Sequence, residues 1–434
     1  MDELKHAPVY VVDGCRTPFL KARGKPGPFA AADLLVAAGR PLLARQPFEP
    51  PDLDEVIVGC VIPSPDEVNI ARVAALRLQC GDKVPAWTVQ RNCASGMQAL
   101  ESGMHAILSG RSHLVLAGGV EAMSRAPLLL NRQMVDWLGD FQKSRALGKK
   151  LKMLTNLRAR MLQPVIGLLH GLTDPVVDLS MGQTAEVLAH LFHIPREEMD
   201  AYAVESHQRL ARAADTGFLA DEIEPVFDDH GNHYDHDDGL RRDVTMKKLA
   251  SLRPAFDRSF GVITAGNSAQ ITDGAALLLL ASEEAVQKYS LPIMGRLDGC
   301  HWAGVPPERM GLGPVHAVVP LLKRFGLSAK DIDFWELNEA FAAQVLACLK
   351  AWADADYCRE QLGLDTPFGD IDRATLNIDG GAIALGHPVG ASGARIVLHL
   401  LHILRRTGSR RGVATLCIGG GQGGAMLVSR GDTP

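Results

Sequence analysis

The sequence predicts a layered α/β protein. Short apolar, β-branched runs alternate with longer amphipathic stretches along the 434 residues, and this alternation is typical of sheets covered by helices. Glycine is abundant, with 43 residues, while aromatic residues make up only 5% of the chain, which favours close helix–sheet packing. The two halves of the chain also resemble each other, which indicates an internal duplication.

Five apolar runs predict strands. They are VYVVDG (9–14), EVIVGC (55–60), LVLAGG (114–119), DFWELN (333–338) and VATLCIGG (413–420). Helix-like segments separate these runs, as a layered α-β-α arrangement requires.

The duplication is predicted from a repeated order of elements. The tripeptide Ala-Ser-Gly at 94–96 recurs at 391–393, and both copies lead into a stretch with helical apolar periodicity. Each stretch then meets a strand that ends in a glycine pair. Because Cys93 precedes the first copy and His387 lies just before the second, a pseudo-twofold arrangement could bring these two side chains together.

We predict three regions in the chain. The N-terminal half comprises residues 1–121 and 262–290, and the C-terminal half comprises 291–434. Residues 122–261 form a loop domain between them, richer in charge and turn-forming residues.

Residues 141–173 of the loop domain form a basic, leucine-rich segment without acidic residues. Its basic side chains are Lys143, Arg145, Lys149, Lys150, Lys152, Arg158 and Arg160. Its apolar side chains, near helical spacing, are Leu147, Leu151, Leu154, Leu157, Met161, Leu162, Ile166 and Leu169. The pattern predicts a cationic amphipathic helix or helix pair. The segment either packs on its own domain or contacts a membrane surface, an acidic partner or a polyanionic cofactor.

Residues 228–239 combine three histidines with five aspartates. These are metal-ligand types, but the run is dense in turn formers and lacks the fixed spacing of a metal site. We therefore predict a solvated hairpin or loop and no metal.

Charge and cysteine usage narrow the class of protein. The net charge of −5 provides no basic field for nucleic acid. The eight cysteines form no CxxC pair, so we expect free thiols in a reducing compartment. Residues 1–14 lack the apolar core of a signal peptide, and no apolar run reaches the length of a membrane span. We expect a cytoplasmic protein, with peripheral membrane association through 141–173 as an open alternative.

Two residues in glycine-rich turns are suited to nucleophilic chemistry. Cys93, in NCASG, lies in a predicted tight turn at a helix N-terminus, where the helix dipole and free N–H groups favour the thiolate. His387, in GHPVGASG, occupies a rigid turn before the duplicated helix. A cysteine and a histidine far apart in sequence are normal for nucleophilic catalysis, because their proximity is spatial. The alternatives are a buried core thiol and a structural histidine.

Two further residues join this set. Cys417 ends a strand and enters the run Gly419-Gly420-Gly421, which continues as another strand and is therefore no dinucleotide fingerprint. Consecutive glycines expose N–H groups that suit an oxyanion hole. Asn338 lies at a strand-to-helix junction, where it is a candidate site residue or an ordinary N-cap.

Together these blocks resemble the thiolase family. NCASGMQAL, NEAFAAQ, GHPVGASGAR and CIGGGQGGAM are similar to its four signature regions, and GGVEAMS, MGQTAE and TAGNSAQITDGAA to further segments. The resemblance covers essentially the whole chain. It implies an α-β-α-β-α fold of two similar halves, with a loop domain over the active site.

The resemblance also implies residue roles. Cys93 carries the acyl group, His387 activates it, and Cys417 moves the α-proton of acetyl-CoA. Asn338 acts with His387 through a water on one thioester oxygen. The N–H groups of Cys93 and Gly419 form a second oxyanion hole. The implied substrate-binding residues are Gly419, Ser268, Met181 and Phe341.

The implied activity is thiolysis of a 3-ketoacyl-CoA in fatty-acid β-oxidation, or the reverse Claisen condensation. Coenzyme A is a co-substrate, and no cofactor or metal is bound. Alternatives are a biosynthetic thiolase that forms acetoacetyl-CoA, a condensing synthase, and a non-catalytic acyl-CoA or lipid-binding protein. Family members are usually homodimers or homotetramers.

The insertion at 141–173 and the long linker at 351–375 resemble the β-subunit of trifunctional β-oxidation complexes. That likeness implies an enoyl-CoA hydratase/3-hydroxyacyl-CoA dehydrogenase partner and membrane contact. Two departures are notable. That group usually has histidine where this chain has Asn338, and many thiolases have Asn-Ala-Ser where this chain reads Asn267-Ser268-Ala269.

Overall fold

A single ten-stranded sheet runs through the protein, in the order β12-β13-β14-β11-β1-β10-β5-β3-β4, with β2 paired to β10. The computed structural model describes residues 8–431. The strands are β1 (Val9–Arg16), β2 (Leu20–Lys21), β3 (Glu55–Gly59), β4 (Ala86–Val89), β5 (Leu114–Ala122), β10 (Thr272–Ser282), β11 (Gly295–Gly304), β12 (Phe334–Leu337), β13 (Arg411–Ile418) and β14 (Gln422–Ser429). The five strands expected from apolar runs are confirmed as β1, β3, β5, β12 and β13.

The sheet repeats the same order outward from its centre. On one side β1, β10, β5 and β3 follow each other, and on the other side β11, β14, β13 and β12. In both series the first three strands are antiparallel and the last pair is parallel. The central pair β1–β11 is antiparallel. This repeat agrees with the duplication inferred from the Ala-Ser-Gly motifs.

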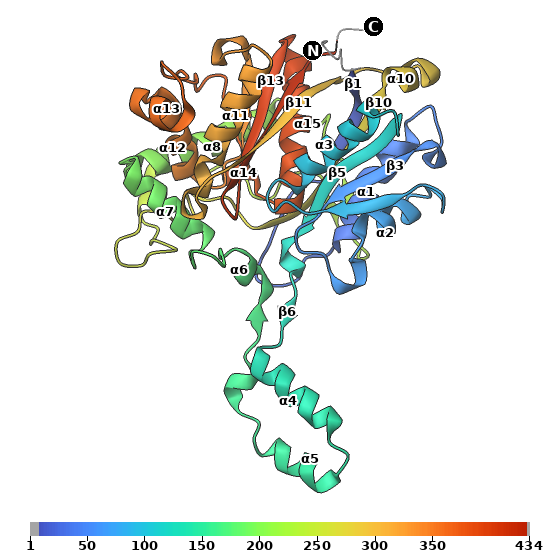
Figure 1. Ribbon diagram of the computed structural model, residues 1–434, viewed down its shortest axis with the longest axis vertical. Coiled ribbons are helices and arrows are strands. Elements are labelled where there is room, and N and C mark those ends of the chain that lie inside the picture. Colours follow the sequence, from blue (N-terminus) through green and yellow to red (C-terminus); the bar gives the residue numbers. More distant parts are fainter. Residues whose placement is uncertain (1–7, 432–434) are drawn as a thin grey trace.

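Helices and sheet halves form five layers (Figure 1). In the middle, α3 (Ser95–Leu108) and α15 (Val389–Thr407) pack on each other and on strands of the sheet. The outer layers are α1 (Ala31–Ala44) with α2 (Ile70–Arg77) over the N-terminal half, and α11 (Gly313–Arg324) with α12 (Ala342–Ala353) over the C-terminal half. The α-β-α-β-α architecture is therefore confirmed.

The two middle helices cross where the duplicated glycines lie. A Cβ atom built on Gly96 of α3 would lie 2.8 Å from Ala394 N and 2.9 Å from Gly390 O of α15. A Cβ on Gly393 would lie 2.6 Å from Met97 N. Both contacts are to backbone atoms, so the helices approach this closely only because neither glycine carries a side chain.

The loop domain supplies helices that cover the C-terminal half. They are α7 (Met181–Leu191), α8 (Arg196–Asp215) and α9 (Met246–Ala250). α7 and α8 pack on α12, and α8 also packs on α14 (Ala382–Leu385). Two further helices, α10 (Glu283–Tyr289) and α13 (Ala355–Leu362), follow β10 and α12.

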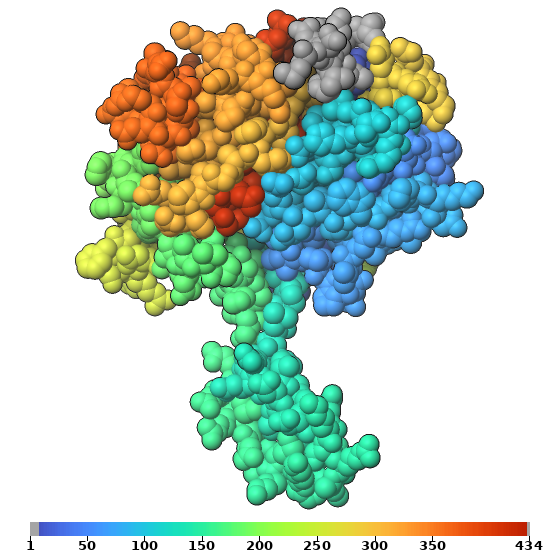
Figure 2. Space-filling model, in the orientation of Figure 1, coloured from blue at the N-terminus to red at the C-terminus, as the bar shows by residue number. Residues whose placement is uncertain are grey.

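A helical hairpin projects far from the body on a two-stranded stalk (Figures 1 and 2). The stalk pairs β6 (Leu128–Leu129) with β7 (Val165–Ile166), and the hairpin contains α4 (Arg132–Lys143) and α5 (Leu147–Leu154). A helix pair was expected, but starting at residue 141. The predicted start was wrong because the segment 141–173 was recognised by its lack of acidic residues. Most of α4 lies before this segment and carries Asp136 and Asp140. The two helices contact each other, as where Trp137 of α4 donates to Met153 O of α5 at 3.1 Å, and they project away from the body (Figure 1). α6 (Gly167–Gly171) leads back to the body.

The histidine- and aspartate-rich segment forms the predicted hairpin, with β8 (Val226–Phe227) paired to β9 (His233–Tyr234). One of its aspartates is buried, which the sequence did not indicate. Asp237 accepts hydrogen bonds from both terminal nitrogens of buried Arg16, at 2.7 and 2.8 Å. This ion pair fixes the hairpin to the N-terminal half.

None of the helices in residues 8–431 combines the length and the apolar composition needed to cross a membrane. The localisation expected from the N-terminal segment rests partly on residues 1–7, which lie outside the described residues.

Replacement of Gly96 by alanine is expected to destabilise the protein by about 1–3 kcal/mol, because the added methyl group overpacks a backbone crossing. The matched control is Gly139→Ala, also in a helix, where a Cβ meets open space. That control should be neutral or slightly stabilising. Urea unfolding followed by tryptophan fluorescence measures both, and equal midpoints for the two variants would contradict the crossing described above.

Candidate active site

Cys93 sits in a tight turn that is tied to the glycine-rich turn after β13. Asn92 has a left-handed backbone (φ 43°), and the Ser95 hydroxyl accepts from Arg91 N and donates to Asn92 O, at 2.9 and 2.7 Å. The Asn92 side-chain amide donates to Gly419 O at 2.7 Å. The turn thus places the cysteine sulfur beside Gly419, from the opposite half of the chain.

The Cys93 thiol is protonated in the resting protein. Burial raises its pKa, while hydrogen bonds from the N–H groups of Gly419 and Cys93 act in the opposite direction. This result corrects the expectation that the helix N-terminus favours the thiolate, because desolvation of the sulfur is the larger effect. A thiol of this kind needs a base to become a nucleophile.

His387 has the form that such a base requires. Its Nδ1 lies 2.6 Å from the Ser392 hydroxyl, and that hydroxyl donates its one proton to Pro388 O at 3.0 Å. With the hydroxyl proton directed at Pro388 O, Nδ1 carries the ring proton and donates to Ser392, and Nε2 presents a lone pair. Nε2 is buried without a partner among the described residues. Burial and the nearby charge of Arg395 lower the pKa of His387 to about 4, so the ring is neutral at pH 7.

Asn338 follows β12 with its side chain fully enclosed. Neither its amide nitrogen nor its amide oxygen has a hydrogen-bond partner within residues 8–431. The residue that caps α12 is Phe341, so the N-cap alternative for Asn338 is wrong. A buried amide with both ends free is costly unless it binds a water or a ligand atom.

Cys417 is the last but one residue of β13 and is 1% exposed. Burial raises the pKa of its thiol well above the usual value, and a negative charge on Cys93 raises it further. At neutral pH the thiol is therefore protonated, which suits it as an acid. The expectation of an ordinary thiol pKa near 8.5 is corrected by this burial.

The glycines after Cys417 form the turn that the site requires. Gly420 and Gly421 have left-handed φ angles of 90° and 79°. A Cβ on Gly421 would lie 2.2 Å from Val305 O, so no side chain fits there. The turn directs the backbone of Gly419 toward Cys93.

A cavity of about 270 Å³ opens beside this turn. Cys93, Met181 and Gly419 line it, as does the backbone that returns from the stalk, residues 171–176. His387, Asn338 and Cys417 do not line the cavity, although the neighbouring Val389 does. Its walls are mostly apolar side chains.

The other two expected substrate-binding residues do not line the cavity. Ser268 and Phe341 pair with each other in an isolated β-bridge, and the Ser268 hydroxyl donates to Thr264 O at 2.7 Å. Phe341 is buried with its ring edge-on to Phe256. The bridge connects the segment before β10 to the segment between β12 and α12.

Sequence reasoning missed one ionisable residue of the site. Glu121, at the end of β5, is fully buried and accepts from Val61 N and Ile62 N at 2.9 and 3.0 Å. Burial raises its pKa to about 7. It lies in the GGVEAMS segment, whose position after a predicted strand was the only indication. Across residues 8–431, no group of three or more His, Cys, Asp or Glu side chains is placed to hold a metal.

Models of the thiolase N-terminal and C-terminal domains match residues 9–284 and 291–430. The chain belongs to the thiolase family. The family predicted from the signature regions is thus confirmed. The 3-ketoacyl-CoA thiolase of Yersinia pestis (strain Pestoides F) is 36% identical over 97% of this chain and 96% of its own length.

Solved thiolase structures share the fold. Human mitochondrial 3-ketoacyl-CoA thiolase has a TM-score of 0.83 at 36% identity, over 98% of this chain and 99% of that one. A second structure of that enzyme, in complex with CoA, has the same score and covers 98% of each chain. The acetyl-CoA acetyltransferase of Bacillus anthracis has a TM-score of 0.83 at 35% identity, over 98% and 99% of the two chains.

Proposed function

We propose that this thiolase cleaves 3-ketoacyl-CoA with coenzyme A to give acetyl-CoA and a shortened acyl-CoA, and catalyses the reverse condensation. The observation that carries the proposal is a thiolase fold with a cavity lined by Cys93, whose thiol pKa is raised, and by Val389, two residues after the neutral His387. Coenzyme A is the co-substrate, and the chemistry needs no bound cofactor. The enzyme is an acetyl-CoA C-acyltransferase.

The first half-reaction breaks a carbon–carbon bond. His387 Nε2 accepts the Cys93 proton, and the sulfur attacks the 3-keto carbon. The bond between C2 and C3 then breaks, which leaves the acyl group on Cys93 and releases the enolate of acetyl-CoA. Cys417 donates its proton to C2 of that enolate. Its raised thiol pKa keeps this proton available at neutral pH.

The second half-reaction returns Cys417, Cys93 and His387 to their starting protonation states. The Cys417 thiolate takes the proton of the coenzyme A thiol, and the resulting thiolate attacks the acyl group. Collapse of the tetrahedral intermediate expels the Cys93 sulfur, which recovers its proton from His387. The proton balance closes without an outside acid or base.

Two sets of donors stabilise the oxygens that become negative. The free amide of Asn338, through a water, and His387 serve one thioester oxygen. The N–H groups of Cys93 and Gly419 serve the other oxygen, a role supported by their lowering effect on the pKa of the Cys93 thiol. Donors of this kind contribute roughly 3–4 kcal/mol each to the transition state.

Cys93→Ala is expected to abolish acyl-enzyme formation and turnover, because no other group can hold the acyl chain. Cys417→Ala should still acylate at Cys93 but fail to exchange the α-protons of acetyl-CoA. Mass spectrometry of the protein and NMR in D₂O measure the two steps. The control is Cys80→Ala, a buried thiol after α2 that acts on neither Cys93 nor Cys417, which should retain both. Normal exchange in Cys417→Ala would contradict the role given to Cys417.

We further propose that the hairpin docks on an anionic membrane surface. Leu147 and Leu151 are 73% and 58% exposed, and Lys149 and Lys152 are exposed among them on the same helix. An exposed apolar face with basic neighbours is the pattern of helices that lie in a lipid interface. The stalk holds this surface away from the body (Figure 2), so nothing of the enzyme obstructs it.

Sedimentation with vesicles of phosphatidylserine and phosphatidylcholine tests this proposal. The double variant Leu147→Gln/Leu151→Gln should lose most binding, and binding of the wild type should fall at high salt. Leu76→Gln on α2, also an exposed leucine, should bind like the wild type. Equal sedimentation of the wild type and the double variant would exclude the hairpin as the docking surface.

We also propose a homodimer or homotetramer, joined to an enoyl-CoA hydratase/3-hydroxyacyl-CoA dehydrogenase subunit. Within residues 8–431, β4 has β3 as its one strand neighbour, and its Trp87 and Val89 are half-buried. An edge strand with apolar side chains suits pairing with a second copy. The hydratase/dehydrogenase partner is proposed from the insertion, which resembles that of trifunctional β-subunits.

Native mass spectrometry of the purified chain should give two or four copies, and a monomer would contradict the first part. Affinity purification from cells that express the full chain should retain a hydratase/dehydrogenase polypeptide. Recovery of the homo-oligomer alone would contradict the second part.

A further inference from the structure

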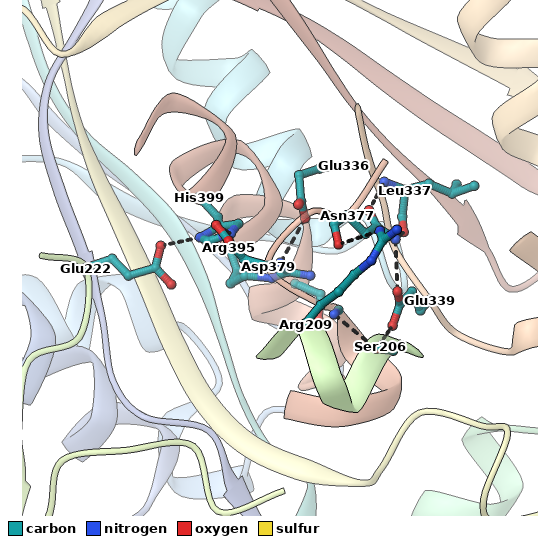
Figure 3. A network of polar contacts seen from close by, with 12 residues as sticks. Ser206, Arg209, Glu222, Glu336, Leu337, Glu339, Asn377, Asp379, Arg395 and His399 are labelled. Carbon is teal, nitrogen blue, oxygen red and sulfur yellow. Dashed lines mark hydrogen bonds and ion pairs between the residues drawn. The ribbon is translucent and has the colours of Figure 1, made fainter. Parts of the chain in front are cut away.

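Buried polar contacts surround the end of β12 and one face of α15 (Figure 3). On α15, Arg395 donates to Glu336 at 3.0 Å, and His399 contacts Glu222 at 2.8 Å. Each of these carboxylates therefore has a basic partner. Glu339, two residues after the end of β12, has a different set of partners.

Glu339 is 1% exposed, and its carboxylate accepts four hydrogen bonds from neutral groups. Two donors belong to α8 of the loop domain, the Tyr202 hydroxyl at 2.9 Å and the Ser206 hydroxyl at 2.6 Å. The other two are the Asn377 side-chain amide at 3.0 Å and Ile383 N at 3.3 Å. A buried carboxylate is costly unless hydrogen bonds satisfy both of its oxygens. The charge of Glu339 therefore requires these separate segments to converge on it.

The segment that Glu339 contacts leads directly to the turn of His387. Ile383 lies in α14, and His387 follows the end of that helix by two residues. A Cβ atom built on Gly381 would lie 2.4 Å from the Glu339 carboxyl carbon, so the backbone here packs against the carboxyl group itself. The Ser206 hydroxyl that donates to Glu339 also accepts from Gly381 N, at 3.2 Å. Glu339 thus joins α8 to the chain just before His387.

Glu339 is also bonded to Asn338, whose side chain depends on its neighbours for its position. Within the described part of the chain, neither end of the Asn338 amide has a hydrogen-bond partner. Its backbone is fixed on one side by Asn338 N, which donates to Thr415 O of β13 at 2.9 Å. On the other side it is fixed by the next residue, through the four contacts of the Glu339 carboxylate.

We propose that Glu339 is a positioning residue, which holds Asn338 and His387 at the separation needed for a water and a thioester oxygen between them. The proposal rests on the proposed function, in which these two residues serve one thioester oxygen. That oxygen belongs to acetyl-CoA, because the other donors lie at the Cys93 sulfur, which carries the acyl group. Two of the four contacts come from α8, so the loop domain takes part in setting this separation.

Glu339→Gln tests the proposal, because it keeps the size of the side chain but replaces one acceptor oxygen by an amide N–H₂ group. The hydroxyls of α8 can turn to accept from that group, whereas the N–H groups of Asn377 and Ile383 can only donate. Each carboxylate oxygen accepts from one of these two N–H groups. Either orientation of the glutamine therefore sets one donor against another and displaces the contact.

Two reactions are measured for each variant. Exchange of the α-protons of acetyl-CoA in D₂O, followed by NMR, needs the donors on the thioester oxygen. It should fall by about 10- to 100-fold, because misplacement by about 1 Å can cost a hundredfold in rate. Alkylation of Cys93 by iodoacetamide, followed by mass spectrometry, needs His387 but not that oxygen. It should stay near the wild-type rate, since His387 has its own hydrogen bonds to the Ser392 hydroxyl and Gln270 O.

Glu222→Gln is the matched control. Glu222 is also 1% exposed, but its carboxylate contacts Arg16 and His399. The ratio of exchange to alkylation should equal that of the wild type in this control. A merely structural role of Glu339 would lower both rates together, so an unchanged ratio in Glu339→Gln contradicts the proposal.

A second variant covers the case in which circular dichroism shows that Glu339→Gln does not fold. Ser206→Ala removes the shortest of the four contacts and should lower the ratio in the same direction. The wild-type ratio in Ser206→Ala would then contradict the proposal. Failure of the proposed function is separate, because the wild-type protein itself would then show neither thiolysis nor exchange.

Discussion

The close crossing of α3 and α15 is the constraint on which the rest of the structure depends. Gly96 of α3 meets the backbone of Gly390 and Ala394 of α15. Each helix begins at a turn that carries a candidate catalytic residue: Cys93 lies three residues before Gly96, and His387 lies three residues before Gly390. The crossing therefore fixes the two helix starts, and with them the turns of Cys93 and His387, relative to each other. A Cβ atom added to Gly119 of β5 would lie 2.0 Å from Gly390 O of α15. The strand and the two helices therefore meet at one point.

Burial then determines the chemistry of the residues brought together. Burial disfavours charge, so both cysteines keep their protons and the histidine stays neutral. In the proposed mechanism the proton transfers therefore begin between neutral groups. Charge develops only when the substrate supplies an oxygen to carry it, and fixed N–H donors are already in place. The desolvation that makes Cys93 a poor thiolate at rest also strengthens these donors.

The sequence predicted the parts of this site that are local and periodic. Strands, a helix or helix pair in the insertion and the three glycine-rich turns around Cys93, His387 and Cys417 follow from apolar spacing and glycine placement, whereas the signature regions came from the family resemblance. Features made by distant residues were missed. Burial of Glu121 and the pairing of Arg395 with Glu336 require the fold itself, since nothing near these residues in sequence distinguishes them from solvated charges. The thiol pKa was misjudged for the same reason, because desolvation is a property of the packed site.

The stalk joins the hairpin to the body near the cavity that Cys93 lines. Pairing of β6 with β7 brings the two ends of the insertion together. The helical hairpin at its tip can therefore lengthen or change sequence with little effect on the fold. The returning backbone at 171–176 has no such freedom, because it forms a wall of the cavity beside Cys93. Evolution can vary the far end of this insertion independently of the enzyme, whereas its base must change together with the acyl chains that the pocket admits.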